Sequence, residues 1–189
     1  MRKVKLQIQI SVDGLIAGPN GEMDWMVWNW DGALKNYVSA LTEPVDCIIL
    51  GRKLAEGFIP HWSAASEIAN EEQIFALKMS ETHKVVFTKT LKSAEWSNTV
   101  LAKGNLSEEI NSLKNQDGGD IIVYGGGSFV SSLINEGLVD EYYLFVNPSI
   151  LVNGMPIFQS LAAKQNLVLK QAQGFDCGIT VLCFEIKKD

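Results

Sequence analysis

The sequence has few of the residues that cross-link a chain or bind a metal. Its 189 residues include three cysteines and two histidines. Cys47, Cys177 and Cys183 are odd in number and stand in apolar stretches, which is typical of small buried residues in a reducing compartment rather than of disulfides. No pair of cysteines or histidines has the spacing of zinc ligands, so we predict no metal site.

The sequence also lacks long hydrophobic runs and an excess of positive charge. No apolar stretch approaches the ~20 residues that span a bilayer. Residues 1–5 enter an alternating pattern directly, without the features of a signal peptide. Sixteen basic against 22 acidic residues give a formal net charge of −6, which argues against nucleic acid or an anionic membrane as the main partner. We therefore expect a cytoplasmic protein whose partner is a small molecule.

Strand-like runs recur along the whole chain, with helical patterns between the earlier ones. Residues 3–10 alternate apolar and polar positions, whereas the short runs at 46–50, 84–88 and 120–124 are continuously apolar, as strands covered on both faces are. Helices are predicted from Ser66 to Met79, after Ser107 as N-cap, and from Ser128 to Glu136. The late runs at 141–148, 166–173 and 178–186 have no helix between them, and the last two form a predicted hairpin. This order predicts one α/β domain over residues 1–189, with a mainly parallel sheet flanked by helices and an antiparallel hairpin at its C-terminal edge.

Three consecutive glycines stand where the predicted strand at 120–124 turns into a helix. Gly125, Gly126 and Gly127 are followed at once by Ser128 and Phe129. Glycines let backbone N–H groups approach a ligand closely, and a helix N-terminus carries a partial positive charge, so the segment favours phosphate binding over a plain turn. It is neither Gly-x-Gly-x-x-Gly nor a Walker loop, which lowers the case for a Rossmann dehydrogenase or a nucleotide triphosphatase.

Cationic groups follow two other predicted strands. Gly51, Arg52 and Lys53 come after the run at 46–50, and the run at 84–88 ends in Thr88, which Lys89 follows. Ligands of open α/β sheets bind at the carboxyl ends of the strands, and Arg and Lys are the side chains that bind phosphate. Their joint placement in an acidic chain indicates a local site for an anion.

The segment after the first strand combines a turn, a loop and a group of tryptophans. Asp13-Gly14 makes the turn, and Trp25, Trp28 and Trp30 end the loop. A mobile aromatic loop would close over a planar ring and exclude water. The alternative is an aromatic cluster at the edge of the core, and composition favours neither.

In this order, these segments resemble the dihydrofolate reductase superfamily. The resemblance is strongest to the reductase domain of the bifunctional deaminase/reductase of riboflavin biosynthesis and its stand-alone relatives, and it covers nearly the whole chain. The matching segments are Ser11–Ala17, Leu50-Gly51-Arg52, Lys84–Leu91, Gly125-Gly126-Gly127, Gly137–Glu141, Asn147-Pro148 and Gly154–Phe158.

The resemblance implies an eight-stranded, mostly parallel sheet and reduction by NADPH. In the family, residues matching Gly51, Arg52, Lys53, Thr88 and Lys89 lie near the adenosine-side phosphates. Those matching Gly125, Gly126, Gly127, Ser128 and Phe129 hold the diphosphate, and those near Ala17 and Gly18 contact the nicotinamide. NADPH is expected over NADH, because a 2′-phosphate favours Arg, Lys and hydroxyl donors where an NAD site carries an acid. Leu54 departs from the pattern, because relatives often have a phosphate-contacting Thr there.

The substrate side rests on three residues. Trp25 matches the loop tryptophan of folate reductases, and Asp31 is the nearest carboxylate at about the offset of the acid that binds and helps protonate the pterin. Asp31 equally fits the N-cap of a helix. Asp13 matches a residue near the substrate in the riboflavin-type branch, and it also fits an Asp-Gly turn. Asp31 and Asp13 are therefore candidate catalytic residues, and Trp25 and Asp13 candidate substrate-binding residues, with both structural alternatives open.

The expected function is hydride transfer from NADPH to a small pyrimidine- or pterin-type substrate, most like that of 5-amino-6-(5-phosphoribosylamino)uracil reductase. The alternatives are dihydrofolate reductase and a non-catalytic nucleotide-binding module on the same fold. The resemblance also implies a homodimer, and the predicted hairpin places Val181, Leu182 and Phe184 at a sheet edge that a partner would cover.

Overall fold

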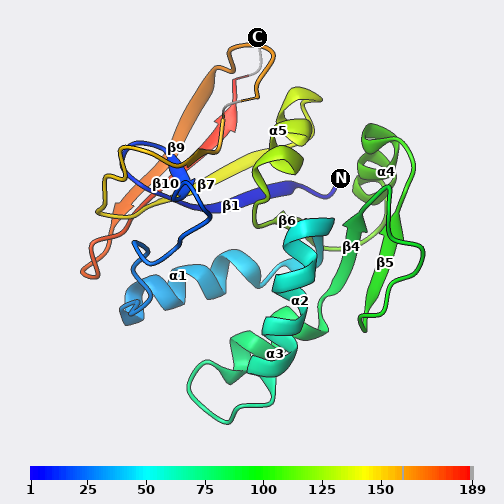
Figure 1. Cartoon of the computed structure of the whole chain (residues 1–189), viewed down its shortest axis with the longest axis horizontal. Coiled ribbons are helices and arrows are strands. Elements are labelled where there is room, and N and C mark those ends of the chain that lie inside the picture. Colours follow the sequence, from blue (N-terminus) through cyan, green and yellow to red (C-terminus); the bar gives the residue numbers. More distant parts are fainter. Residues whose placement is uncertain (159, 188–189) are drawn as a thin grey trace.

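The computed structural model describes residues 1–158 and 160–187, and its centre is an eight-stranded sheet (Figure 1). The strand order is β5-β4-β3-β6-β1-β7-β10-β9. Neighbouring strands are parallel from β5 to β7, while β10 is antiparallel to both β7 and β9. The predicted mainly parallel sheet with a C-terminal hairpin is confirmed. The strands are β1 (Val4–Ile10), β3 (Val45–Gly51), β4 (His83–Phe87), β5 (Thr99–Ala102), β6 (Asp120–Val123), β7 (Glu141–Val146), β9 (Leu167–Gly174) and β10 (Thr180–Ile186).

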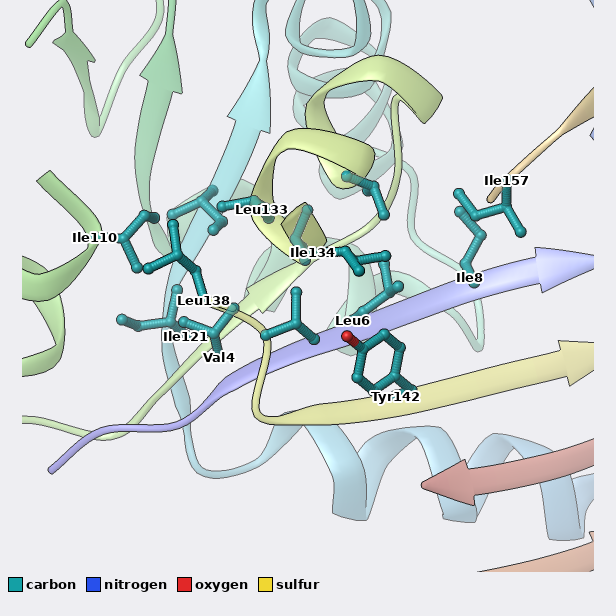
Figure 2. Close-up of a cluster of buried hydrophobic side chains, with 14 of the residues drawn as sticks. Val4, Leu6, Ile8, Ile110, Ile121, Leu133, Ile134, Leu138, Tyr142 and Ile157 are labelled. Atoms are coloured by element: carbon teal, nitrogen blue, oxygen red, sulfur yellow. The ribbon is translucent and has the colours of Figure 1, made fainter. Parts of the chain in front are cut away.

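Helices cover both faces of this sheet. Helices α4 (Leu106–Lys114) and α5 (Gly127–Asn135) lie on one face, and α1 (Gly32–Thr42), α2 (Arg52–Ser66) and α3 (Gln73–Glu81) lie on the other (Figure 1). On the α5 side, apolar residues of α4 and α5 pack on β1, β6 and β7, and Figure 2 shows Leu133 and Ile134 above Val4 and Leu6. On the other side, α2 and α3 bury apolar residues of β3, β4 and β6, and α1 packs on β7 and β10.

The alternation in β1 has a different meaning from that of a strand with one solvated face. Val4, Leu6, Ile8 and Ile10 enter the core under α5, as the period of two predicts. Because β1 lies between β6 and β7 in the middle of the sheet, the other face is also buried, and Lys5 and Gln7 are only 7% and 6% exposed. The Lys5 ammonium is paired with the Asp120 carboxylate at 2.7 Å. A buried charge needs such a partner, because desolvation is costly.

A second, two-stranded ribbon joins distant parts of the chain beside the main sheet. It pairs β2 (Leu15–Ala17) with β8 (Met155–Pro156) in antiparallel fashion. Gly154 makes this possible, because a Cβ there would overlap the carbonyl oxygen of Ala17. The ribbon therefore fixes the segment after β1 against the segment after β7.

Three helix boundaries differ from the prediction. The single helix expected over 66–79 is wrong, because α2 already runs from Arg52 to Ser66 and residues 67–72 separate it from α3. Asn105, rather than Ser107, caps α4, and its Oδ1 accepts the Glu108 N–H at 3.2 Å. Helix α5 begins one residue earlier than expected, with Gly126 as N-cap. The sequence patterns also missed β2, β5 and β8, which are all short.

The outer edge of the sheet is β9 rather than β10. Val181 is 1% exposed within the core, and β10 is bonded on both sides, so the expectation that Val181, Leu182 and Phe184 stand at an edge is wrong. The edge strand exposes Val168 and Leu169 instead. No helix in the described ranges is both long enough and apolar enough to span a membrane.

Candidate cofactor and substrate site

The N-termini of α2 and α5 open on one hollow of about 400 Å³. Strands β3 and β6 end beside each other in the parallel sheet, so the helices that follow them start on the same edge. The lining residues come from these two corners and from the end of β4: Gly51, Arg52, Lys53, Leu54, Phe87, Gly126, Gly127, Ser128, Phe129 and Ser132. The structure thus brings together the glycine triplet and the Gly51–Lys53 segment, which the sequence assigned separately to phosphate contacts.

Neither of the two helices that meet at this hollow has a side-chain cap. Gly51 and Gly126 are their N-cap residues, and neither supplies an acceptor for the first-turn N–H groups. By contrast, α1 and α4 are capped by the carboxylate of Asp31 and the amide of Asn105. Free N–H groups at converging helix ends, each with a partial positive charge, are suited to binding an anion.

The glycines at the hollow allow the two corners to come close. A Cβ on Gly51 would lie 3.0 Å from the Phe129 Cβ, which is tighter than ordinary packing. Gly125 and Gly126 have φ angles of 134° and 83°, a region that other residues avoid. Gly126 faces Leu54 as well as Phe129, and a Cβ there would lie 4.0 Å from the Leu54 Cβ.

Two cationic side chains border the hollow, and they differ in their contacts. Nη1 of Arg52 donates to Oε1 of Glu56 at 2.7 Å, one helical turn further along α2. Among the described residues, the other N–H groups of this guanidinium have no partner. Lys53 is exposed and makes no ion pair within the described part of the chain. Leu54 contributes an apolar wall.

Thr88 and Lys89 follow β4 next to this hollow but do not line it. Phe87, which pairs with Gly51 across the strands, lines it, and its ring lies 5.1 Å from that of Phe129. The Thr88 hydroxyl is buried and accepts the N–H groups of Thr90 and Leu91, each at 3.1 Å. In this structure the hydroxyl therefore shapes the turn after β4, and Lys89 is exposed.

The residues expected near the nicotinamide belong to β2 and the turn after it. A Cβ on Gly127 would lie 3.5 Å from Cδ1 of Ile16, so β2 touches the glycine corner directly. Ala17 is buried in the ribbon, and Gly18 donates its N–H to the carbonyl of Glu22 at 2.9 Å. This places the Ala17–Gly18 backbone on the same edge of the fold as the hollow.

Asp13 holds the loop after β7. Its carboxylate accepts the Ser11 hydroxyl at 2.6 Å and the N–H groups of Leu151 and Val152 at 3.1 and 2.8 Å. These bonds lower the pKa of Asp13 below its ordinary value, and the bond from Ser11 has the largest effect. Val152 has a φ of 66°, an unusual conformation for a β-branched residue, and its bond to Asp13 holds it there.

Asp31 has the contacts of the N-cap interpretation. Oδ1 accepts the Leu34 N–H at 2.8 Å. Oδ2 accepts the N–H of Cys177, a residue of the turn between β9 and β10, at 2.9 Å. These backbone bonds lower the pKa of the carboxyl group, and the bond from Leu34 has the largest effect. Asp31 therefore joins α1 to the hairpin as an ionised group, and both of its oxygens are engaged.

The three tryptophans of the first loop have different surroundings. Trp30 stacks on Phe145 at 6.4 Å and belongs to the core edge, whereas Trp28 is 63% exposed. Trp25 is half-buried, its indole N–H donates to the carbonyl of Glu22, and its own carbonyl accepts the Ser149 hydroxyl. The position of Trp30 thus fits the alternative that the tryptophans form an aromatic cluster at the edge of the core.

Sequence reasoning gave no role to Asn147, which fastens this loop. The residue is 0% exposed, accepts the Val27 N–H at 2.9 Å and donates to the Gln9 amide oxygen at 2.7 Å. The signal that could have identified it is an amide directly at the end of the apolar β7 pattern. Asn147 connects the ends of β1 and β7 to the tryptophan loop.

Comparison with known proteins agrees with this architecture. The family model of the RibD C-terminal domain matches residues 2–181. Among curated proteins, the uncharacterized YyaP of Bacillus subtilis is 30% identical over 183 residues, covering 97% of this chain and 94% of that protein. The uncharacterized YwjB of the same organism is 28% identical over 174 residues, covering 92% of each.

Solved structures show the same fold at low sequence identity. A putative riboflavin biosynthesis protein from Shewanella sp. PV-4 superposes with a TM-score of 0.72 at 21% identity, over 100% of both chains. A deaminase/5-amino-6-(5-phosphoribosylamino)uracil reductase from Thermotoga maritima gives 0.70 at 15%, over 98% of this chain and 57% of that one. Dihydrofolate reductase from Enterococcus faecalis, complexed with NADP(H), gives 0.62 at 15%, over 98% and 97%.

Proposed function

Because the chain belongs to the RibD C-terminal domain family, we propose that it is an oxidoreductase that uses NADPH to reduce a small pyrimidine- or pterin-type substrate. The family supports a reductase, and solved proteins that share the fold include a pyrimidine reductase domain and a dihydrofolate reductase. A substrate like that of 5-amino-6-(5-phosphoribosylamino)uracil reductase is the specific form of the proposal.

The observation that carries the proposal is the pair of uncapped helix N-termini at one hollow. A dinucleotide has a diphosphate, and two sets of free N–H groups suit its two charged phosphates. Arg52 and Lys53 at the same hollow supply cationic donors for a further phosphate. The lack of a Cβ at Gly51 lets the two helix N-termini come close, because a Cβ there would lie 3.0 Å from the Phe129 Cβ.

The roles of the residues follow from their positions. Gly51, Gly126, Gly127 and Ser128 would bind the diphosphate through backbone N–H groups. The Ala17–Gly18 backbone would orient the nicotinamide, because β2 touches Gly127 through Ile16. The bound NADPH would supply the hydride, while the chain aligns the partners and excludes water.

Intrinsic fluorescence tests the cofactor assignment, since the chain has five tryptophans. NADPH and NADH are titrated separately, and NADPH is expected to bind at least about tenfold more tightly, equivalent to one charge-assisted contact. Equal affinities in the millimolar range would contradict the proposal. Oxidation of NADPH is then followed with a panel of aminopyrimidines and pteridines.

A second candidate is a non-catalytic nucleotide-binding module, favoured by the engagement of both candidate carboxylates. Asp13 and Asp31 give all four oxygens to hydrogen bonds within the chain. Tight NADPH binding without turnover of any substrate in the panel would favour the module. Asp31→Asn keeps the cap oxygen but removes the acceptor of the Cys177 N–H, so a fall in turnover indicates a proton-handling role only where NADPH affinity and melting temperature are unchanged. Turnover of dihydrofolate in the same panel would favour dihydrofolate reductase.

A further inference from the structure

Two cationic side chains, Arg52 and Lys53, line the hollow, and among the described residues only Arg52 forms an ion pair. The pair is partly exposed, with 35% of the Arg52 side chain and 46% of the Glu56 side chain accessible. Arg52 is the first residue of α2 and lines the hollow. Glu56, one turn later, accepts its Nη1–H at 2.7 Å but does not line the hollow. The carboxylate thus contacts the guanidinium from outside the space that a ligand would fill.

The chemistry of arginine makes a single contact of this kind useful. A guanidinium has five N–H donors in a rigid plane, and Glu56 engages one nitrogen, so the other nitrogens remain able to bind a phosphate. The stem of the side chain is flexible, and a free arginine loses that freedom when it binds. A guanidinium that is already held loses less.

We infer that Glu56 is a positioning residue, which holds the Arg52 guanidinium beside the hollow for a phosphate group of the cofactor. The inference rests on the proposed function, and it adds a residue that does not itself touch the ligand. Lys53 provides the contrast, because it borders the same hollow without an ion pair and approaches a phosphate as a freely moving charge.

Two effects of Glu56 on an anion have opposite signs, and this allows a clean test. Its negative charge repels a phosphate, whereas its contact with Arg52 favours one. Glu56→Asp keeps the charge but shortens the side chain by one methylene, so it weakens mainly the contact. Glu56→Gln keeps the length and an acceptor oxygen, so it removes mainly the charge.

The experiment measures calorimetric binding of 2′,5′-adenosine bisphosphate to the intact chain and its variants. Glu56→Asp is expected to weaken binding about two- to tenfold, the cost of ordering one long side chain. Glu56→Gln is expected to bind at least as tightly as the original chain. Arg52→Ala is expected to weaken binding, and Glu56→Asp in that background to cause no further loss. Glu72→Asp is a control for shortening a paired glutamate, because Glu72 is the N-cap residue of α3 and pairs with Lys35 away from the hollow.

Each other outcome overturns the inference in a recognisable way. Unchanged or tighter binding by Glu56→Asp excludes positioning. A loss that persists in the Arg52→Ala background shows a general disturbance of α2. If the original chain does not bind the bisphosphate, both the inference and the proposed function fail. If it binds and Arg52→Ala has no effect, the inference alone fails.

Discussion

Gly51 of β3 and Phe129 of α5 touch so closely that a Cβ on Gly51 would lie 3.0 Å from the Phe129 Cβ. Gly51 is the N-cap residue of α2, and Phe129 belongs to the first turn of α5; neither helix has a side-chain cap. The contact therefore sets the distance between the two groups of N–H donors. Several measurable consequences depend on it and on the residues around it.

Gly51→Ala is expected to push α2 and α5 apart. Overpacking at such a site costs about 1–3 kcal/mol of the free energy of unfolding, and we expect NADPH affinity to fall about tenfold or more. Urea unfolding and fluorescence titration measure the two effects. Gly57→Ala is the control, because a Cβ there meets nothing within 4 Å, and an alanine inside a helix should add up to about 1 kcal/mol. Unaltered NADPH binding by Gly51→Ala would refute the role of this contact.

Leu54→Thr is expected to strengthen NADPH binding. It adds a hydroxyl donor to the wall of the hollow, and a hydrogen bond to a charged phosphate should increase affinity about three- to tenfold. Leu54 also packs against the core cluster under α2, so stability should fall by about 1–2 kcal/mol. Leu54→Val is the matched control, because valine has the shape of threonine without the hydroxyl. Equal NADPH affinities of the two variants would show that no phosphate lies near this position.

Asp31→Ala is expected to lower the melting temperature by a few degrees at neutral pH. The folded state lowers the pKa of Asp31 below its ordinary 3.8, so its stabilisation is complete above that value and is lost as pH falls through the lower folded-state pKa. The difference between variant and original chain should therefore vanish in acid. Thermal unfolding across this range, with the exposed Asp117→Ala as control, measures it. A difference that persists in strong acid would contradict the ionised cap.

Lys84 is expected to make stability increase with pH in the mildly alkaline range. The residue is 0% exposed, its Nζ donates to the carbonyls of Ser80 and Thr82, and burial lowers its pKa to about 8 from 10.5. Between these values the unfolded state binds more protons, so the free energy of unfolding rises with pH, by at most about 1.4 kcal/mol per unit.

Lys84→Met should flatten this slope, and the exposed Lys92→Met should not. Urea unfolding at about pH 7.5 and about pH 9.0 compares the slopes below the range in which buried tyrosines ionise. Burial raises the pKa of Tyr37 and Tyr142 to about 12, which opposes the Lys84 effect only at higher pH. Equal slopes in all three proteins would show that Lys84 is not protonated differently on unfolding.

A homodimer remains our expectation, with the outer part of the sheet as its surface. Val168 and Leu169 of β9 are 45% and 52% exposed. A register shift that leaves Lys170 out of the pairing disfavours edge-to-edge association, so the contact would involve apolar side chains. Sedimentation at micromolar concentration should give twice the 20.8 kDa of one chain, and Leu169→Lys should reduce it. Gln171→Lys is the control, and a single-chain mass for the unaltered protein would contradict the dimer.

The elements that the sequence predicted well are those whose pattern and packing agree. Continuous apolar runs gave β3, β4 and β6, because strands covered by helices on both faces need no polar side. The extent of α2 was not predicted, because it contains Gly57 and Pro60, which disfavour helix. Its apolar side still packs on β3 and α3, and tertiary contact outweighs the local preference.

At the candidate site, the sequence could predict where the backbone N–H groups and cationic side chains lie. It could not predict which other residues they contact. Parallel topology brings the ends of β3 and β6 together, so the Gly51 and Gly126 corners had to meet if the order of strands was right. The bonds of Thr88 within its own turn and the i,i+4 pair of Arg52 with Glu56 are local, but the sequence could not show that they would compete with or support ligand contacts, because the extent of α2 was not predicted. Asp31 and Asp13 depend on partners 146 and 138 positions away, which a sequence does not reveal.

The ribbon of β2 and β8 has a consequence for synthesis of the chain. Asp13 and Val152 are 139 positions apart, yet their hydrogen bond and the pairing of Ala17 with Met155 hold the segment proposed to orient the nicotinamide. While a ribosome is still making the second half of the protein, this segment has nothing to pair with. On the proposed function, binding of the reduced ring therefore requires translation to have passed β8, however early the Gly51 and Gly126 corners form.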